Sequence, residues 1–168
     1  MRIFLWCGVF FWGIALGAKL FDIFVLASAY SAAPPASLMY LPYGPHFPHD
    51  PGEFFQPLST LIVPGVVGAA IAGRKTRFDY RVWLLVSATM FIIIWILTPT
   101  IFWPMIRELY GAYTGKMPKT TPEIITLLHR WIVWDWFRTA LIAVGFIASI
   151  RAISVPYPEA EARHTAAS

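Results

Sequence analysis

The passage MFIIIWIL, residues 90–97, decides the fold, because it has no charged side chain and is the most hydrophobic stretch of the chain. It lies within an apolar segment that runs from about residue 82 to residue 106. A helix needs about 20 such residues to cross the hydrocarbon core of a bilayer. Three further segments meet this requirement, at about residues 3–29, 55–73 and 122–153. The sequence therefore predicts an all-α membrane protein whose residues 1–153 form a four-transmembrane-helix bundle.

The composition supports this class of protein. Of the 168 residues, 58% are hydrophobic and only 13% are charged, whereas a soluble domain of this size needs a more polar surface. The small residues at 27–29 fit the cleavage site of a signal peptide. However, the apolar region before them is too long for one, and Lys19 with Asp22 would interrupt it. We therefore expect the first segment to be retained as a helix, and the small, polar residues 154–168 to form a mobile cytoplasmic tail.

The distribution of basic residues predicts the orientation of the chain. Lysine and arginine (13) exceed aspartate and glutamate (9), and the excess lies at the ends of apolar runs, which indicates a membrane rather than a nucleic-acid partner. Basic residues are more frequent at the two termini and between the second and third spans than on the opposite side. The first group is Arg2, Arg74, Lys75, Arg77, Arg81, Arg151 and Arg163, and the second is Arg107, Lys116, Lys119 and Arg130. We expect an inner-membrane protein with both termini in the cytoplasm.

The loop at residues 30–56 joins the first two spans on the outer side. It has no lysine or arginine and is rich in proline and aromatic residues, so we expect it to fold back over the helix ends as a lid. Within it, His46, His49, Asp50 and Glu53 are the one set that resembles a metal site. Because the prolines between them make the spacing irregular, a solvated loop with ordinary histidines is the preferred interpretation. The metal-site hypothesis rests on His46 and His49.

The helical repeat assigns polar stripes to three of the spans, because each residue advances about 100° around the axis. Lipid cannot satisfy polar groups, so these stripes must meet inside the bundle. They are Gly8, Trp12, Ala15, Lys19 and Asp22 in the first span, Thr89, Ile96, Thr100, Trp103 and Arg107 in the third, and Trp131, Asp135, Arg138, Ile142 and Ser149 in the fourth. In the second span, Gly65, Ala69 and Gly73 recur every four residues, which predicts close packing of helix backbones.

Charged groups at bilayer depth are the strongest indication of a site. The stretch VWDWFRTALI, residues 133–142, contains Asp135 and Arg138 near the middle of the fourth span. Each such charge costs roughly 2.5–3.5 kcal/mol at the centre of a bilayer, so we expect Lys19 and Asp22 to meet them in a network in the outer half of the bundle. Two interpretations remain. The network only sets helix register, or it lines a cavity in which Asp135 exchanges a proton while Arg138, Lys19 and His129 stabilise negative charge.

The deeper tryptophans offer a second, weaker indication. They either pack in the bundle or line a pocket for a flat aromatic or quinone-like molecule. They are Trp12, Trp95, Trp134 and Trp136. No glycine-rich phosphate loop, GxSxG elbow or HExxH motif is present, and the one cysteine, Cys7, excludes an intrachain disulfide. No cofactor is strongly implied.

Spans three and four resemble a known family. The Thr-Pro element TPTIFWPMI (residues 98–106), followed by a fourth span in which Trp131 and Arg138 precede small and aliphatic residues, is similar to the anthrone oxygenase-like group of small four-span membrane proteins. The resemblance covers residues 98–152 and implies that Trp131 and Arg138 face the bundle. It also implies cofactor-independent oxidation of a lipophilic aromatic substrate.

Three functions are compatible with these features. The protein binds or oxidises a lipophilic small molecule, with Asp135, Arg138, Lys19, Asp22 and His129 as the candidate catalytic residues. Alternatively, it is a non-catalytic accessory subunit of a larger membrane complex, or a small transporter that works as a homo-oligomer. A cavity that reaches Asp135 would favour the first function, and a solid bundle with polar stripes facing outward would favour the second.

Overall fold

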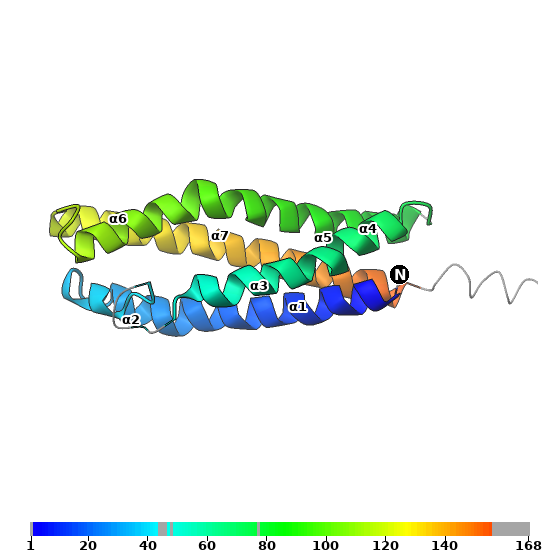
Figure 1. Cartoon of the computed structure of the whole chain (residues 1–168), viewed down its shortest axis with the longest axis horizontal. Helices are drawn as coiled ribbons and strands as arrows, with labels where there is room; N and C mark the ends of the chain where they lie inside the picture. The colour runs from blue at the N-terminus through cyan, green and yellow to red at the C-terminus, as the bar shows by residue number, and fades with distance from the viewer. Residues whose placement is uncertain (1, 44–46, 48, 77, 156–168) are drawn as a thin grey trace, which may run out of the picture.

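A computed structural model describes residues 2–43, 47, 49–76 and 78–155. The described residues form four antiparallel helical rods, and each rod is long and apolar enough to cross a membrane (Figure 1). The rods are Arg2–Ser31, Pro51–Ala72, Phe78–Tyr113 and Thr121–Ser154. The predicted all-α bundle of four membrane-spanning helices is therefore confirmed. The N-terminus and the end of the fourth rod lie together at one end of the bundle, here called the termini end (Figure 1).

Three of the rods are divided into segments by a turn of π-helix. The first rod consists of α1 (Arg2–Phe21), η1 (Asp22–Leu26) and α2 (Ala27–Ser31), and the second of α3 (Pro51–Val63), η3 (Pro64–Gly68) and α4 (Ala69–Ala72). The third consists of α5 (Phe78–Leu97), η4 (Thr98–Phe102) and α6 (Trp103–Tyr113), whereas the fourth is the single helix α7 (Thr121–Ser154). Proline has no amide hydrogen to donate, and a wider turn lets the helix continue past it. This explains η3 and η4, which contain Pro64 and Pro99.

Polar caps extend the rods beyond the apolar runs that predicted them. The Asp50 side chain accepts hydrogen bonds from the amides of Gly52 (2.5 Å) and Glu53 (3.2 Å), so α3 begins at Pro51 and not near residue 55. At the start of α7, Thr120 and Glu123 form a reciprocal capping box. The third rod also continues beyond residue 106, to Tyr113.

The buried faces agree with the polar stripes of the first and fourth spans but not with that of the third. Gly8, Trp12, Ala15, Lys19 and Asp22 are all buried. By contrast, the third-span stripe is wrong as a buried face, because all five of its members are exposed: Thr89, Ile96, Thr100, Trp103 and Arg107. The hydroxyl of Thr100 is satisfied within its own helix by the carbonyl of Ile96, at 2.7 Å, and so needs no partner in the bundle.

A different polar group, Ser87, faces inward from the third rod. Its hydroxyl lies 2.8 Å from that of Ser149 and accepts a hydrogen bond from Trp12 Nε1 at 3.1 Å. These hydrogen bonds join α5, α7 and α1 inside the bundle. The third span therefore contributes a serine to the core, from roughly the opposite side of the helix to the predicted stripe.

The first and second rods approach each other closely at two glycines, Gly8 and Gly65. A Cβ atom added to Gly65 would lie 2.6 Å from the backbone nitrogen of Gly8 and 2.9 Å from its Cα. Gly65, Ala69 and Gly73 are buried, as the four-residue repeat of small residues predicts for close backbone contact. Only glycine fits at Gly65 without moving the first rod.

Candidate functional site

Four charged side chains meet inside the bundle. Lys19 Nζ donates to Asp135 Oδ2 at 2.8 Å and also to the carboxylate of Asp22, while Arg138 donates to Asp135 Oδ1. Lys19 is 2% exposed and Asp135 is 1% exposed, so neither is solvated. Two cations and two carboxylates make the cluster neutral, which offsets much of the cost of placing charges at bilayer depth. We call these four residues the charge cluster.

Helical spacing creates each half of the charge cluster. Lys19 and Asp22 are three residues apart across the junction of α1 and η1, and Asp135 and Arg138 are three residues apart on α7. Residues at this spacing lie on one helix face and can form an ion pair. The tertiary contact is the Lys19–Asp135 pair, which joins the two faces.

Phe102 holds the Arg138 side chain in place. The guanidinium carbon lies 3.8 Å from the centroid of the Phe102 ring, and Phe102 is fully buried. This is a close cation–π contact in a site with little water, where such contacts are strongest. Arg138 Nε is buried and has no hydrogen-bond partner among the described residues. The arginine therefore keeps one donor that the protein does not use.

A cavity of about 480 Å³ lies against the charge cluster, between α3 on one side and α5, η4 and α6 on the other. Lys19 and Arg138 line it, whereas Asp22 and Asp135 do not. The cavity therefore reaches the two cationic partners of Asp135 and not Asp135 itself, which differs from the expected cavity in which Asp135 exchanges a proton directly. Cavities that hold small molecules commonly measure roughly 300–1,000 Å³, with mostly apolar walls and a few polar groups. The walls here are rich in aromatic rings: Trp12, Phe55, Phe91, Trp95, Phe102 and Trp103.

Tyr43 also lines this cavity and is not among the site residues predicted from the sequence. Its ring packs edge-on against Trp131, with ring centroids 6.1 Å apart, and Trp131 Nε1 donates to the Tyr30 hydroxyl at 2.9 Å. Burial raises the pKa of the Tyr43 hydroxyl, so this group remains a neutral donor at physiological pH. Its position depends on how the loop folds over Trp131, and no helical repeat contains that information.

The sequence model of one family, anthrone oxygenase, matches residues 50–148. The matched part is more than half of the chain and extends from the start of α3 through most of α7. The chain belongs to the anthrone oxygenase family. No curated protein and no solved structure matches it.

The family match covers only part of the site. Asp135, Arg138, Phe102 and most of the cavity wall lie within residues 50–148 of this anthrone oxygenase family member. Lys19 lies outside the match, on the first rod. The first rod thus adds a cation, together with Trp12 and Ala15, to a wall that the matched region builds for the most part.

The remaining predicted site residues lie apart from the cavity. His129 is exposed on α7 and is not in the cavity wall. His49 is exposed and lies 2.6 Å from Glu53, and His46 lies outside the described residues. Within the described ranges, no three His, Cys, Asp or Glu side chains are grouped as a metal would require. The structure thus brings together four of the five candidate catalytic residues and leaves out His129.

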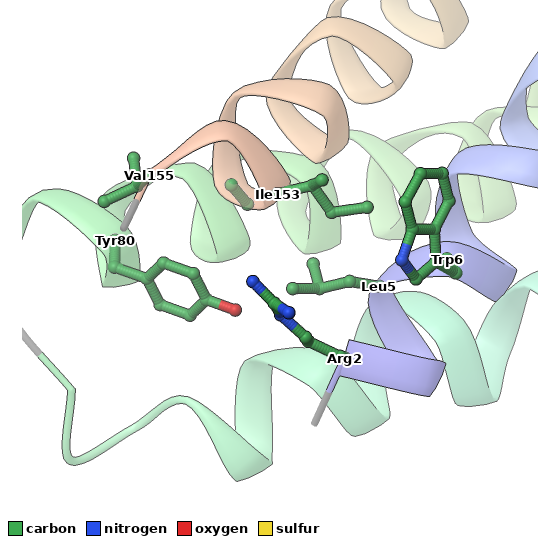
Figure 2. Close-up of a pocket in the computed structure, with 7 residues that line it drawn as sticks. Arg2, Leu5, Trp6, Tyr80, Ile153 and Val155 are labelled. Carbon is green, nitrogen blue, oxygen red and sulfur yellow. The ribbon is translucent and has the colours of Figure 1, made fainter. Parts of the chain in front are cut away.

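A second, smaller cavity of about 140 Å³ lies at the termini end. In Figure 2 the Arg2 guanidinium and the Tyr80 hydroxyl point toward each other, with Leu5, Trp6, Ile153 and Val155 around them. None of the predicted site residues lines this cavity. The larger cavity, which meets the charge cluster, is therefore the candidate functional site of this anthrone oxygenase family member.

Proposed function

We propose that the larger cavity binds a flat, lipophilic aromatic ketone of the anthrone type and that the protein oxidises it with dioxygen. One observation carries the proposal: two cations, Lys19 and Arg138, line an otherwise mainly apolar and aromatic cavity. An anthrone has a ring carbonyl opposite an acidic methylene group. Losing a methylene proton gives an anion whose charge moves onto the carbonyl oxygen. Paired cations in a site with little water stabilise such an oxygen anion.

The charge balance of the cluster explains how the proton leaves. Lys19 donates its own proton to Asp135, to which it is hydrogen-bonded, and then takes up the methylene proton that the substrate loses. Asp135 is therefore the final proton acceptor. Before the transfer, the site holds two cations and two carboxylates. After it, one carboxylate is neutral and the substrate oxygen is the second anion. The net charge at bilayer depth stays at zero throughout, which avoids the cost of an uncompensated buried charge.

The oxidation then balances with dioxygen alone. The carbanion carbon forms a bond to one oxygen atom of dioxygen, and the resulting peroxide takes up the proton. Loss of water breaks the oxygen–oxygen bond and removes the second methylene hydrogen, which leaves a carbonyl. One methylene and one dioxygen give one carbonyl and one water. Tyr43 also lines the cavity, and in this proposal its neutral hydroxyl donates to the developing oxygen anion.

The proposal is tested with the protein in lipid nanodiscs, a hydroxyanthrone and isotopically heavy dioxygen. The quinone product should carry one heavy oxygen atom and should form faster than in protein-free nanodiscs, which measure spontaneous oxidation. Arg138→Gln should lower the protein-dependent rate about 100-fold, as the loss of one oxyanion donor does elsewhere. Arg151→Gln removes the same charge from an exposed position of the same helix and should keep the rate. A folded Arg138→Gln protein with an unchanged rate would contradict the proposal.

We also propose that both termini face the cytoplasm of a bacterial inner membrane, which places the cavity in the outer half of the bilayer. The cluster of Arg74, Lys75 and Arg81 at the termini end supports this orientation. A reporter that is active only in the cytoplasm should be active when fused after residue 155 and inactive when inserted near Gly115. The reverse pattern would invert the topology and leave the fold unchanged.

A further inference from the structure

The larger cavity opens sideways, toward the bilayer. On α3, Gln56 and Thr60 line it and are exposed, and they are four residues apart on one face. On the opposite side Trp95, Pro99 and Trp103 line it and are also exposed. All five belong to rods that are long and apolar enough to span the membrane, so this exposed rim lies beside lipid. We call the gap between these two sets of residues the mouth.

We infer that the substrate enters the site through the mouth, directly from the bilayer, and not from the water beyond the loop. The inference rests on the proposed function, since it names the route to the same site. Its substrate class is a flat, membrane-partitioned aromatic molecule with an acidic oxygen at one end.

The arrangement of polar groups supports this route. Exposed indole rings flank one side of the mouth, and the two cations lie on the inner wall, where Lys19 is 2% exposed. A lipophilic molecule therefore passes apolar rings first and reaches the charges last. Its acidic oxygen must lead, because the cavity offers cations only at its inner end.

The described part of the loop between the first two rods covers the route from the water to the cavity. Leu38 and Leu41 are each 1% exposed and pack in the same apolar cluster as Trp131 and Phe102. Tyr43 continues this cover to the cavity wall. A substrate that came from the water on this side would have to displace buried leucines, whereas none of the described residues covers the mouth in this way.

The test measures binding and not turnover, so that it remains valid if oxidation fails. The probe is a hydroxylated anthraquinone, which has no methylene to oxidise, and its association with the protein in nanodiscs is followed by stopped-flow absorbance. Thr60→Trp places a large ring in the mouth and should slow association about tenfold, within the range over which association rates vary among variants of one site. Leu61→Trp adds the same ring to the neighbouring, exposed position, which does not line the cavity, and should have no effect.

A second mouth variant shows whether slower binding in Thr60→Trp comes from blocking the mouth or from a folding defect. Gln56→Trp lies one helical turn away on the same rim and should slow association in the same way. Slower binding in both mouth variants and normal binding in Leu61→Trp support the route. Normal association in both mouth variants would overturn it, while the proposed site would stand. A wild-type protein that does not bind the probe would overturn the proposed function together with the route.

Discussion

Lys19 Nζ lies 2.8 Å from Asp135 Oδ2, and this ion pair joins the first and last rods across 116 positions of the sequence. Both side chains are buried, so removal of either partner leaves a charge without compensation at bilayer depth. The pair also connects a residue outside the family match to one inside it. The first rod is thereby part of the site and not only part of the scaffold.

The first prediction concerns the neutrality of the charge cluster. Lys19→Met leaves two carboxylates and one cation, and should lower the free energy of unfolding by about 3–5 kcal/mol, as breaking a buried ion pair does. Adding Asp22→Asn restores a neutral Asp135–Arg138 pair and should recover part of this loss. Unfolding in mixed detergent micelles measures both variants. If the double variant is as unstable as the single one, neutrality is not what stabilises the cluster.

The contact between the first two rods gives the second prediction. Gly65→Ala forces a Cβ atom against the Gly8 backbone, at 2.6 Å from its nitrogen, and should destabilise the protein by about 2 kcal/mol, which is typical of overpacking. Gly8→Ala is the matched control, since its Cβ would meet the Gly65 backbone at an ordinary 3.6 Å. Thermal unfolding of the two variants should differ clearly. Equal melting temperatures would show that the rods can separate without cost.

A third prediction tests the ring beneath Arg138. Phe102→Leu removes the cation–π contact at 3.8 Å and should cost up to about 2 kcal/mol of stability beyond the lost apolar area. It should also lower turnover, because Arg138 loses its orientation. Phe91→Leu makes the same substitution at another buried ring of the cavity wall, over which no guanidinium of the described residues is stacked. Similar losses in the two variants would mean that Phe102 contributes only apolar packing.

The fourth prediction concerns His129. This histidine is exposed on α7 and outside the cavity wall, so His129→Ala should leave the turnover of a hydroxyanthrone within about twofold of wild type, as expected of a surface substitution that changes stability little. Arg138→Gln, assayed in the same membranes, provides the positive control. A large loss in His129→Ala would require the histidine to reach the substrate in a conformation other than the one described.

Local sequence patterns predicted one part of the site well. The helical repeat placed Lys19 and Asp22 on one face, and Asp135 and Arg138 on another, and lipid leaves such faces no partner except each other. The same argument failed for the third span, because threonine can bond its own helix, as Thr100 does with Ile96. Hydroxyl groups in a span are therefore weaker guides to the interior than full charges are.

The sequence left open whether a cavity exists and could not predict its walls. Its walls depend on the distance between α3 and α5, on a π-helical turn at Pro99 that rotates the following residues, and on the fold of the loop that carries Tyr43. Each is a tertiary property set by packing between segments far apart in the chain. The stacking of Arg138 on Phe102, which are 36 positions apart, belongs to the same class.

The Gly8–Gly65 contact has a mechanical consequence for the cavity. Every residue of the second rod that lines the cavity, from Pro51 to Ile62, precedes Gly65, and Gly65 itself is not part of the wall. A side chain larger than glycine at Gly65 would push the second rod away from the Gly8 backbone and so change the width of the gap between α3 and α5. The size of the cavity therefore depends on a residue that no bound molecule would touch.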